Sequence, residues 1–77
     1  MGHTPHELNE EFPEQADRIH ALKTSDSHFA GLTETYHTVN RGIHRIESGV
    51  EPADDLVLEE MKKQRLALKD EIAARLA

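Results

Sequence analysis

The stretch FAGLTETYHTVNRGIHRIESGV, residues 29–50, carries apolar side chains at alternating intervals of three and four residues. This spacing places them in one narrow stripe along a helix, which is the pattern of a coiled-coil seam. A stripe narrower than the apolar face of an ordinary globular helix needs a second helix lying lengthwise against it. The stretch therefore predicts packing between helices through Phe29, Leu32, Tyr36, Val39, Ile43, Ile46 and Val50.

Helix stop and start signals lie at the end of this stretch and directly after it. Gly49 suits the left-handed residue that closes a helix and Pro52 comes three residues later, so a helix is expected over about residues 26–48. Asp54 then supplies a cap for another helix, expected over about residues 54–76. A short connection between two long helices predicts an antiparallel hairpin, whose second helix offers Leu58, Met61, Leu68 and Ile72 to the seam.

Pairing the two helices about a centre near residue 51 brings their apolar positions together. The expected neighbours are Ile46 and Leu56, Ile43 and Leu58, Tyr36 and Arg65, Leu32 and Leu68, and Phe29 and Ile72. Tyr36 is expected to pack there with its hydroxyl at the helix edge, with recognition of a partner as the alternative. Arg65 occupies a position where an apolar residue is expected, and it could stack on Tyr36 or bond Glu34. The complete predicted seam is Phe29, Leu32, Tyr36, Val39, Ile43, Ile46, Leu58, Met61, Arg65, Leu68 and Ile72.

The residues before the hairpin predict a further, shorter helix. The segment TPHE, residues 4–7, matches a helix start with a capping threonine, a proline at the first helical position and a capping-box glutamate. A first helix is expected over about residues 7–23, with a kink or restart at Pro13. The segment TSDS, residues 24–27, favours a turn, although a continuous helix through it remains an alternative.

Length and composition limit the fold class to a small all-α protein. The chain has 77 residues and no cysteine, so disulfides and Cys-based zinc sites are excluded. We expect a flexible terminus over residues 1–6 and one helical domain over residues 7–76. A hairpin this small has little core, and Leu66 with Ala73 forms a second, weaker apolar line, so self-association is expected. The longest apolar run has three residues, and a soluble, cytoplasmic protein without membrane contact is therefore expected.

Charge is distributed unevenly along the chain. Residues 1–60 contain four basic and thirteen acidic side chains, whereas residues 61–77 contain five basic and two acidic ones. The overall net charge of -6 argues against a nucleic-acid-binding protein, because the phosphate backbone attracts basic surfaces. We interpret the basic C-terminal segment as pairing with acids on a neighbouring helix. The alternative is that this segment binds nucleic acid through Lys62, Lys63, Lys69 and Arg75.

No pattern of residues predicts catalysis, a cofactor or a metal site. His37 and His44 are seven residues apart, roughly 10 Å along a helix, which is too far to chelate one ion. The amino-terminal Met1-Gly2-His3 could form a square-planar copper or nickel site through His3 if Met1 is retained, and a disordered terminus is the preferred interpretation. The paired carboxylates are consecutive, so on a helix they diverge by about 100 degrees and cannot flank one substrate. We expect that the protein is not an enzyme.

Several motifs resemble those of a known family. They are Asp26-Ser27-His28-Phe29, Leu32, Tyr36, Ile43, Ile46-Glu47, Pro52-Ala53-Asp54-Asp55, Leu58 and the run KKQRLALKDEI over residues 62–72. Over about residues 7–76 the chain is similar to the YdcH-like family of small bacterial proteins, and the run is its most specific part. The resemblance implies a helical hairpin or coiled coil of the bacterial cytoplasm, without catalysis, cofactor or known binding residues.

These observations together favour a structural or interaction protein. We expect a coiled-coil hairpin that self-associates and binds a protein partner, whose identity the sequence does not give. The alternatives are a regulator that binds nucleic acid through the basic C-terminal helix, and copper or nickel binding at the N-terminus.

Overall fold

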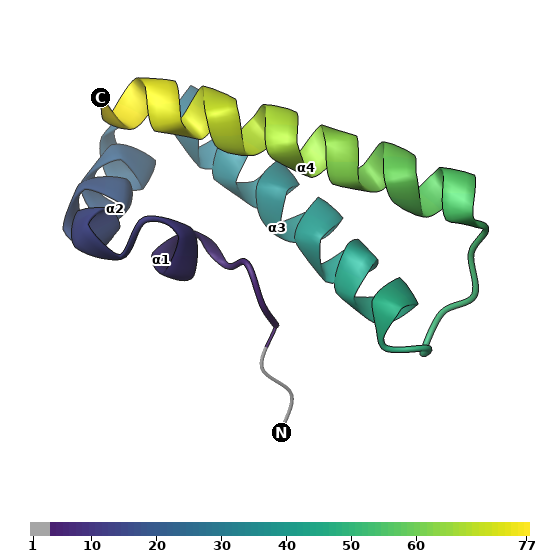
Figure 1. Cartoon of the computed structure of the whole chain (residues 1–77). Coiled ribbons are helices and arrows are strands. Elements are labelled where there is room, and N and C mark those ends of the chain that lie inside the picture. Colours follow the sequence, from purple (N-terminus) through teal and green to yellow (C-terminus); the bar gives the residue numbers. More distant parts are fainter. Residues whose placement is uncertain (1–3) are drawn as a thin grey trace.

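The computed structural model describes residues 4–77, and this part of the chain contains helices and no strands (Figure 1). The predicted all-α hairpin is confirmed, because the two longest helices pack against each other in antiparallel directions. In chain order the elements are α1 (Leu8–Glu11), the 3-10 helix η1 (Pro13–Gln15), α2 (Ala16–Ser25), α3 (Ser27–Glu47) and α4 (Asp55–Leu76).

Local signals set both ends of α3. The Asp26 carboxylate accepts hydrogen bonds from the backbone N–H groups of His28 and Phe29, at 3.0 and 3.2 Å. Because Asp26 itself has extended dihedral angles, α2 and α3 are separate helices, and the alternative of one continuous helix is wrong. At the other end Gly49 has a φ of +80°, the left-handed conformation predicted for it.

Side chains also bond backbone groups at both ends of α4, where the helix itself offers no partner. Asp54 Oδ1 accepts from the backbone N–H of Leu56 at 2.9 Å, as expected for a cap. At its C-terminus, Arg18 Nε of α2 donates to the Leu76 carbonyl at 3.1 Å. A cation near the last carbonyls of a helix is favourable, so this contact fixes α2 across the end of α4.

The core lies at the end of the hairpin that is remote from its loop. There α1 and α2 pack against α3 and α4 (Figure 1). At the opposite end, toward the loop, α3 and α4 diverge, and α1 and α2 do not reach them there (Figure 1). The buried cluster consists of Leu8, Ile19, Phe29, Tyr36, Ile72 and Leu76, with Phe12, Leu22, Leu32 and Leu68 packed around it.

The predicted helix start at residues 4–7 is wrong. Helix α1 begins at Leu8, and Glu7 precedes it without capping it through its side chain. The carbonyls of Pro5 and His6 accept hydrogen bonds from α3 side chains, and His6 has a φ of +64°. Contacts with α3 therefore hold these residues in a non-helical conformation. The single helix expected over residues 7–23 is correspondingly replaced by α1, η1 and α2, with the predicted restart at Pro13.

Two apolar residues near the loop are exposed, although the sequence predicted that they pack between the two long helices. Val50 is 73% exposed because Gly49 ends the helix one residue before it. Leu56, the expected neighbour of Ile46, is 76% exposed on the first turn of α4, where the two helices diverge. The prediction that both residues extend the seam is wrong.

Candidate functional site

The residues of the predicted seam line the contact between α3 and α4 to different depths. Several are buried, namely Phe29, Tyr36, Val39, Ile43 and Ile72. The others are half-buried, namely Leu32, Ile46, Leu58, Met61, Arg65 and Leu68. Sequence periodicity gave no signal for two buried polar residues on the same helix, Thr33 and Asn40.

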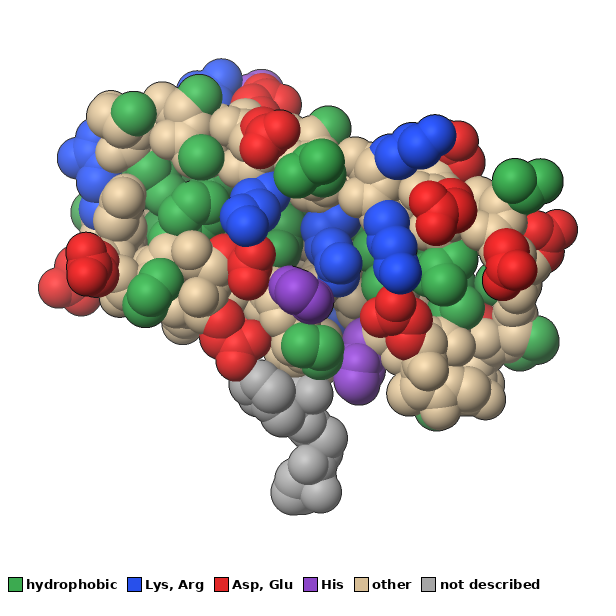
Figure 2. Space-filling view, in the orientation of Figure 1, with side chains coloured by type: hydrophobic (Ala, Val, Ile, Leu, Met, Phe, Trp, Pro, Cys, Tyr) green, Lys and Arg blue, Asp and Glu red, His purple; other side chains and the backbone are tan. Residues whose placement is uncertain are grey.

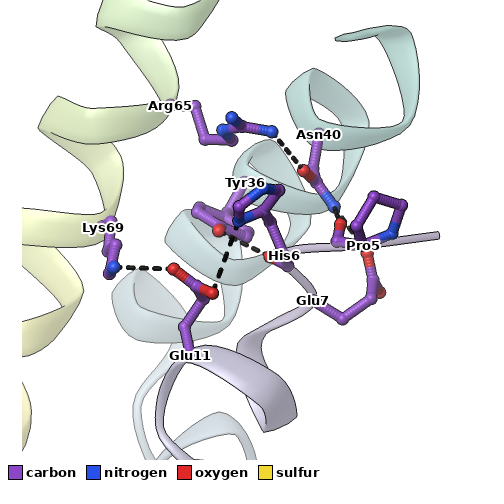
Figure 3. A network of polar contacts seen from close by, with 8 residues as sticks. All are labelled: Pro5, His6, Glu7, Glu11, Tyr36, Asn40, Arg65 and Lys69. Carbon is purple, nitrogen blue, oxygen red and sulfur yellow. Dashed lines mark hydrogen bonds and ion pairs between the residues drawn. The ribbon is translucent and has the colours of Figure 1, made fainter. Parts of the chain in front are cut away.

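Asn40 is the centre of a polar network between α3, α4 and the N-terminal residues (Figure 3). Its side chain is 1% exposed, and its Nδ2 donates to the Pro5 carbonyl at 2.9 Å and to Glu7 Oε2 at 2.8 Å. Its Oδ1 accepts from Arg65 Nη1 at 2.9 Å. Arg65 thus bonds the amide of Asn40, whereas the sequence suggested stacking on Tyr36 or a bond to Glu34. Every polar atom of the buried amide has a partner.

Tyr36 holds the N-terminal strap, by which we mean residues 4–12, against α3. Its hydroxyl donates to the His6 carbonyl at 2.6 Å, and the side chain is 1% exposed. The hydroxyl, which was expected at the helix edge, is thus covered by the strap. Burial, with smaller contributions from the charges of Glu11 and Glu7, raises the pKa of Tyr36 to about 12.

Ionic contacts also join the strap to the hairpin. Lys69 Nζ donates to Glu11 Oε1 at 2.6 Å, and His6 Nδ1 lies 3.5 Å from Glu11 Oε2. His37 Nδ1 lies 3.1 Å from Glu7 Oε1, yet this buried nitrogen makes no well-aligned hydrogen bond. A proton on Nδ1 is needed to make that contact attractive, since two acceptors would otherwise face each other. The strap is thus tied to both helices of the hairpin.

The hydrogen bond from Lys69 lowers the pKa of Glu11 below its ordinary value of 4.5, despite partial burial of the carboxyl group. A lowered pKa stabilises the folded state at pH values above 4.5, and this contribution is lost as the pH falls through the lowered pKa. We therefore expect the free energy of unfolding of the wild-type protein to fall between pH 5 and pH 3 by more than that of Glu11→Gln. Urea titrations followed by circular dichroism at several pH values measure this difference. Equal pH dependence in the two proteins would contradict it.

A recess of about 200 Å³ lies between the strap and α4. Charged side chains from two directions meet there, since the strap contributes one face and α4 the other (Figure 3). The polar residues lining it are His6, Glu11, Tyr36, Lys62, Arg65 and Lys69.

An open groove of about 640 Å³ runs along the loop-proximal half of α4. Leu56 is largely exposed there, and Val57 is about half-exposed. The residues that line the groove form two neighbouring rows, each spaced three or four positions apart, so they share one flank of the helix. They are Leu56, Val57, Glu60, Met61, Lys63 and Gln64.

Four of the five basic residues of α4 are partnered by acids, and the fifth is Arg65. The pairs are Lys62 with Glu47 at 2.9 Å, Lys63 with Glu60 at 3.8 Å, Lys69 with Glu11 at 2.6 Å and Arg75 with Asp26 at 4.0 Å. The hydrogen bond from Lys62 lowers the pKa of Glu47. Three of these acids belong to neighbouring segments, which agrees with the interpretation of the basic C-terminal residues as partners of acids on neighbouring helices.

Metal ligands do not converge within the described part of the chain. Among residues 4–77 no three His, Cys, Asp or Glu side chains are grouped so as to hold an ion. The candidate ligand His3 lies outside the described residues. None of the helices over residues 4–77 is both long enough and apolar enough to cross a membrane.

A comparison with protein-family models places the hairpin in a family. Residues 29–76, from the first turns of α3 to the end of α4, match the model described as Protein of unknown function (DUF465). This description assigns no function to the family. Neither the curated proteins nor the solved structures gave a match to the chain. The matched segment contains the seam, whereas the strap and α2 precede it.

Proposed function

We propose that this chain, a member of the DUF465 family, is an interaction protein that associates with a second copy of itself. DUF465 is the YdcH-like family of small bacterial helical proteins of unknown function. The resemblance seen in the sequence is thereby confirmed at the level of the family. The observation that carries the proposal is the exposure of Leu56 and Val57 beside Met61 in the groove on α4.

Solvent exposure of this groove is unfavourable in an isolated chain. Burying apolar area stabilises by roughly 25 cal/mol per Å², so covering a large aliphatic side chain contributes about 1.5–3 kcal/mol. The hairpin is also short, and a chain of 77 residues buries a smaller fraction of its surface than a larger domain does. Association through the groove would supply burial that the monomer lacks.

The charges at the groove favour a second copy as its occupant. Glu60 and Lys63 lie three residues apart, and their contact of 3.8 Å within one chain is between highly exposed groups, so it contributes little. Two α4 helices that pack in antiparallel directions about a twofold axis can place Glu60 of each copy opposite Lys63 of the other. A groove with both signs of charge is therefore complementary to itself.

We expect sedimentation equilibrium at tens of micromolar to give a mass well above the 8.7 kDa of one chain. Leu56→Glu should return the mass to that of a monomer, because it places a charge in the proposed contact. Its helical circular dichroism should be retained, since Leu56 is largely exposed in the single chain. A wild-type protein that stays monomeric at these concentrations contradicts the proposal.

Two further sets of variants identify the surface and its orientation. Leu66→Glu makes the same change on the apolar line of Leu66 and Ala73; dissociation by this variant alone would place the contact there. Lys63→Glu should weaken association by setting like charges opposite each other, and the double variant Glu60→Lys with Lys63→Glu should restore it. A failure of the double variant to restore association would exclude the antiparallel arrangement.

A further inference from the structure

The recess between the strap and α4 gathers positive charge in a chain whose net charge is -6. Lys62, Arg65 and Lys69 are spaced by three and four residues, so they project from one flank of α4 toward the strap. Figure 2 shows Lys and Arg side chains side by side in the middle of this face, next to two histidines. The residues lining the recess include these three cations and one carboxylate, that of Glu11.

Of the carboxylates near these cations, only that of Glu11 lines the recess. Glu11 accepts from Lys69, and Glu47, which does not line the recess, accepts from Lys62. Arg65 differs from both lysines because it donates to the neutral amide oxygen of Asn40. An anion entering the recess would therefore meet three cations and one carboxylate in the lining itself, with Glu47 and Glu7 behind it.

The guanidinium group of Arg65 is positioned in advance. Asn40 is buried and its own amide group is fixed by Pro5 and Glu7, so the oxygen that accepts from Arg65 Nη1 has little freedom. A guanidinium group has five N–H donors, and this bond uses one of them. The remaining donors form a planar fork, which matches two oxygens of a phosphate or carboxylate.

We propose that this recess is a binding site for a small oxyanion, specifically a phosphate group, with Arg65 as its principal donor and Lys62 and Lys69 as flanking charges. The volume of about 200 Å³ is several times the roughly 30 Å³ that one water molecule occupies in the liquid. It is below the roughly 300–1,000 Å³ of pockets for drug-sized ligands. The size and the charge together select a compact anion.

Titration of the protein with inorganic phosphate at constant ionic strength, followed by ¹H–¹⁵N NMR, tests the site. We expect saturable shifts at the Arg65 Nε–H and at backbone amides around residues 62–69, which equivalent chloride does not produce. Arg65→Gln should weaken binding about tenfold or more, as expected for loss of a charge-assisted bond. Because the shorter Gln side chain loses the bond to Asn40, circular dichroism of Arg65→Gln checks that the helical fold is retained. Arg65→Lys should give an intermediate affinity because it keeps the charge without the fork.

Arg41→Gln is the matched control, since Arg41 is an exposed arginine on α3 outside the recess. Its affinity for phosphate should stay within about twofold of the wild type, because long-range charge is screened at ordinary salt. A second titration with glycerol 3-phosphate distinguishes the source of the group. Tighter binding than for inorganic phosphate identifies a phosphorylated molecule, and equal or weaker binding identifies the free ion. The proposal is overturned by non-saturable shifts, or by equal losses of affinity in Arg65→Gln and Arg41→Gln.

Discussion

Replacement of Ile43 by aspartate is expected to abolish the cooperative unfolding transition of the protein. Ile43 is 0% exposed in the contact between α3 and α4, so the new carboxylate would be buried without a partner. Burying an unpaired polar or charged group costs several kcal/mol. That cost is comparable to the whole stability of a small domain, about 5–15 kcal/mol. Thermal unfolding followed by circular dichroism at 222 nm measures the result.

Thr35→Asp is the matched control for this substitution. It adds the same charge to the same helix at an exposed position, where only a local hydroxyl bond to the Gly31 carbonyl is lost. Surface changes of this kind usually alter stability by less than about 1 kcal/mol. If Ile43→Asp and Thr35→Asp melt at the same temperature, the contact between α3 and α4 described above is incorrect.

Asn40→Ala is expected to lower the free energy of unfolding by about 2–4 kcal/mol. The substitution removes three hydrogen bonds at once, to Pro5, Glu7 and Arg65, of which two involve charged groups. Hydrogen bonds to charged groups contribute about 1.5–3 kcal/mol each, and partial access of water to these partners reduces the sum. Urea unfolding gives the change in stability.

Loss of Asn40 should also loosen the strap more than the hairpin. Hydrogen exchange should therefore accelerate at the backbone amides of Glu11 and Phe12, which bond to Glu7 and Leu8 within α1. Asn9→Ala makes the same chemical change at an exposed position of α1 and should change stability by no more than about 0.5 kcal/mol. Equal effects of Asn40→Ala and Asn9→Ala would show that the buried network contributes no stability.

Much of the fold was predictable because its signals are local. The alternation of three and four residues between Phe29 and Ile46 defines one face of a helix irrespective of its surroundings. Asp26 and Asp54 cap helices through bonds to backbone groups two or three residues away. Gly49 adopts a conformation that other residues rarely take. The sequence by itself therefore determined the two long helices, their ends and their antiparallel packing.

The tertiary structure alone decided what covers the hairpin and what stays uncovered. Tyr36 and His6 are joined across 30 residues, and Asn40 and Glu7 across 33, so no window of sequence contains both partners. These contacts replace the helix start predicted at residues 4–7 and create the recess beside Arg65. Leu56 was expected opposite Ile46 but is 76% exposed on the first turn of α4, at the end of the hairpin where α3 and α4 diverge (Figure 1). Periodicity specifies which residues can be buried, whereas the docking of distant segments determines which of them are.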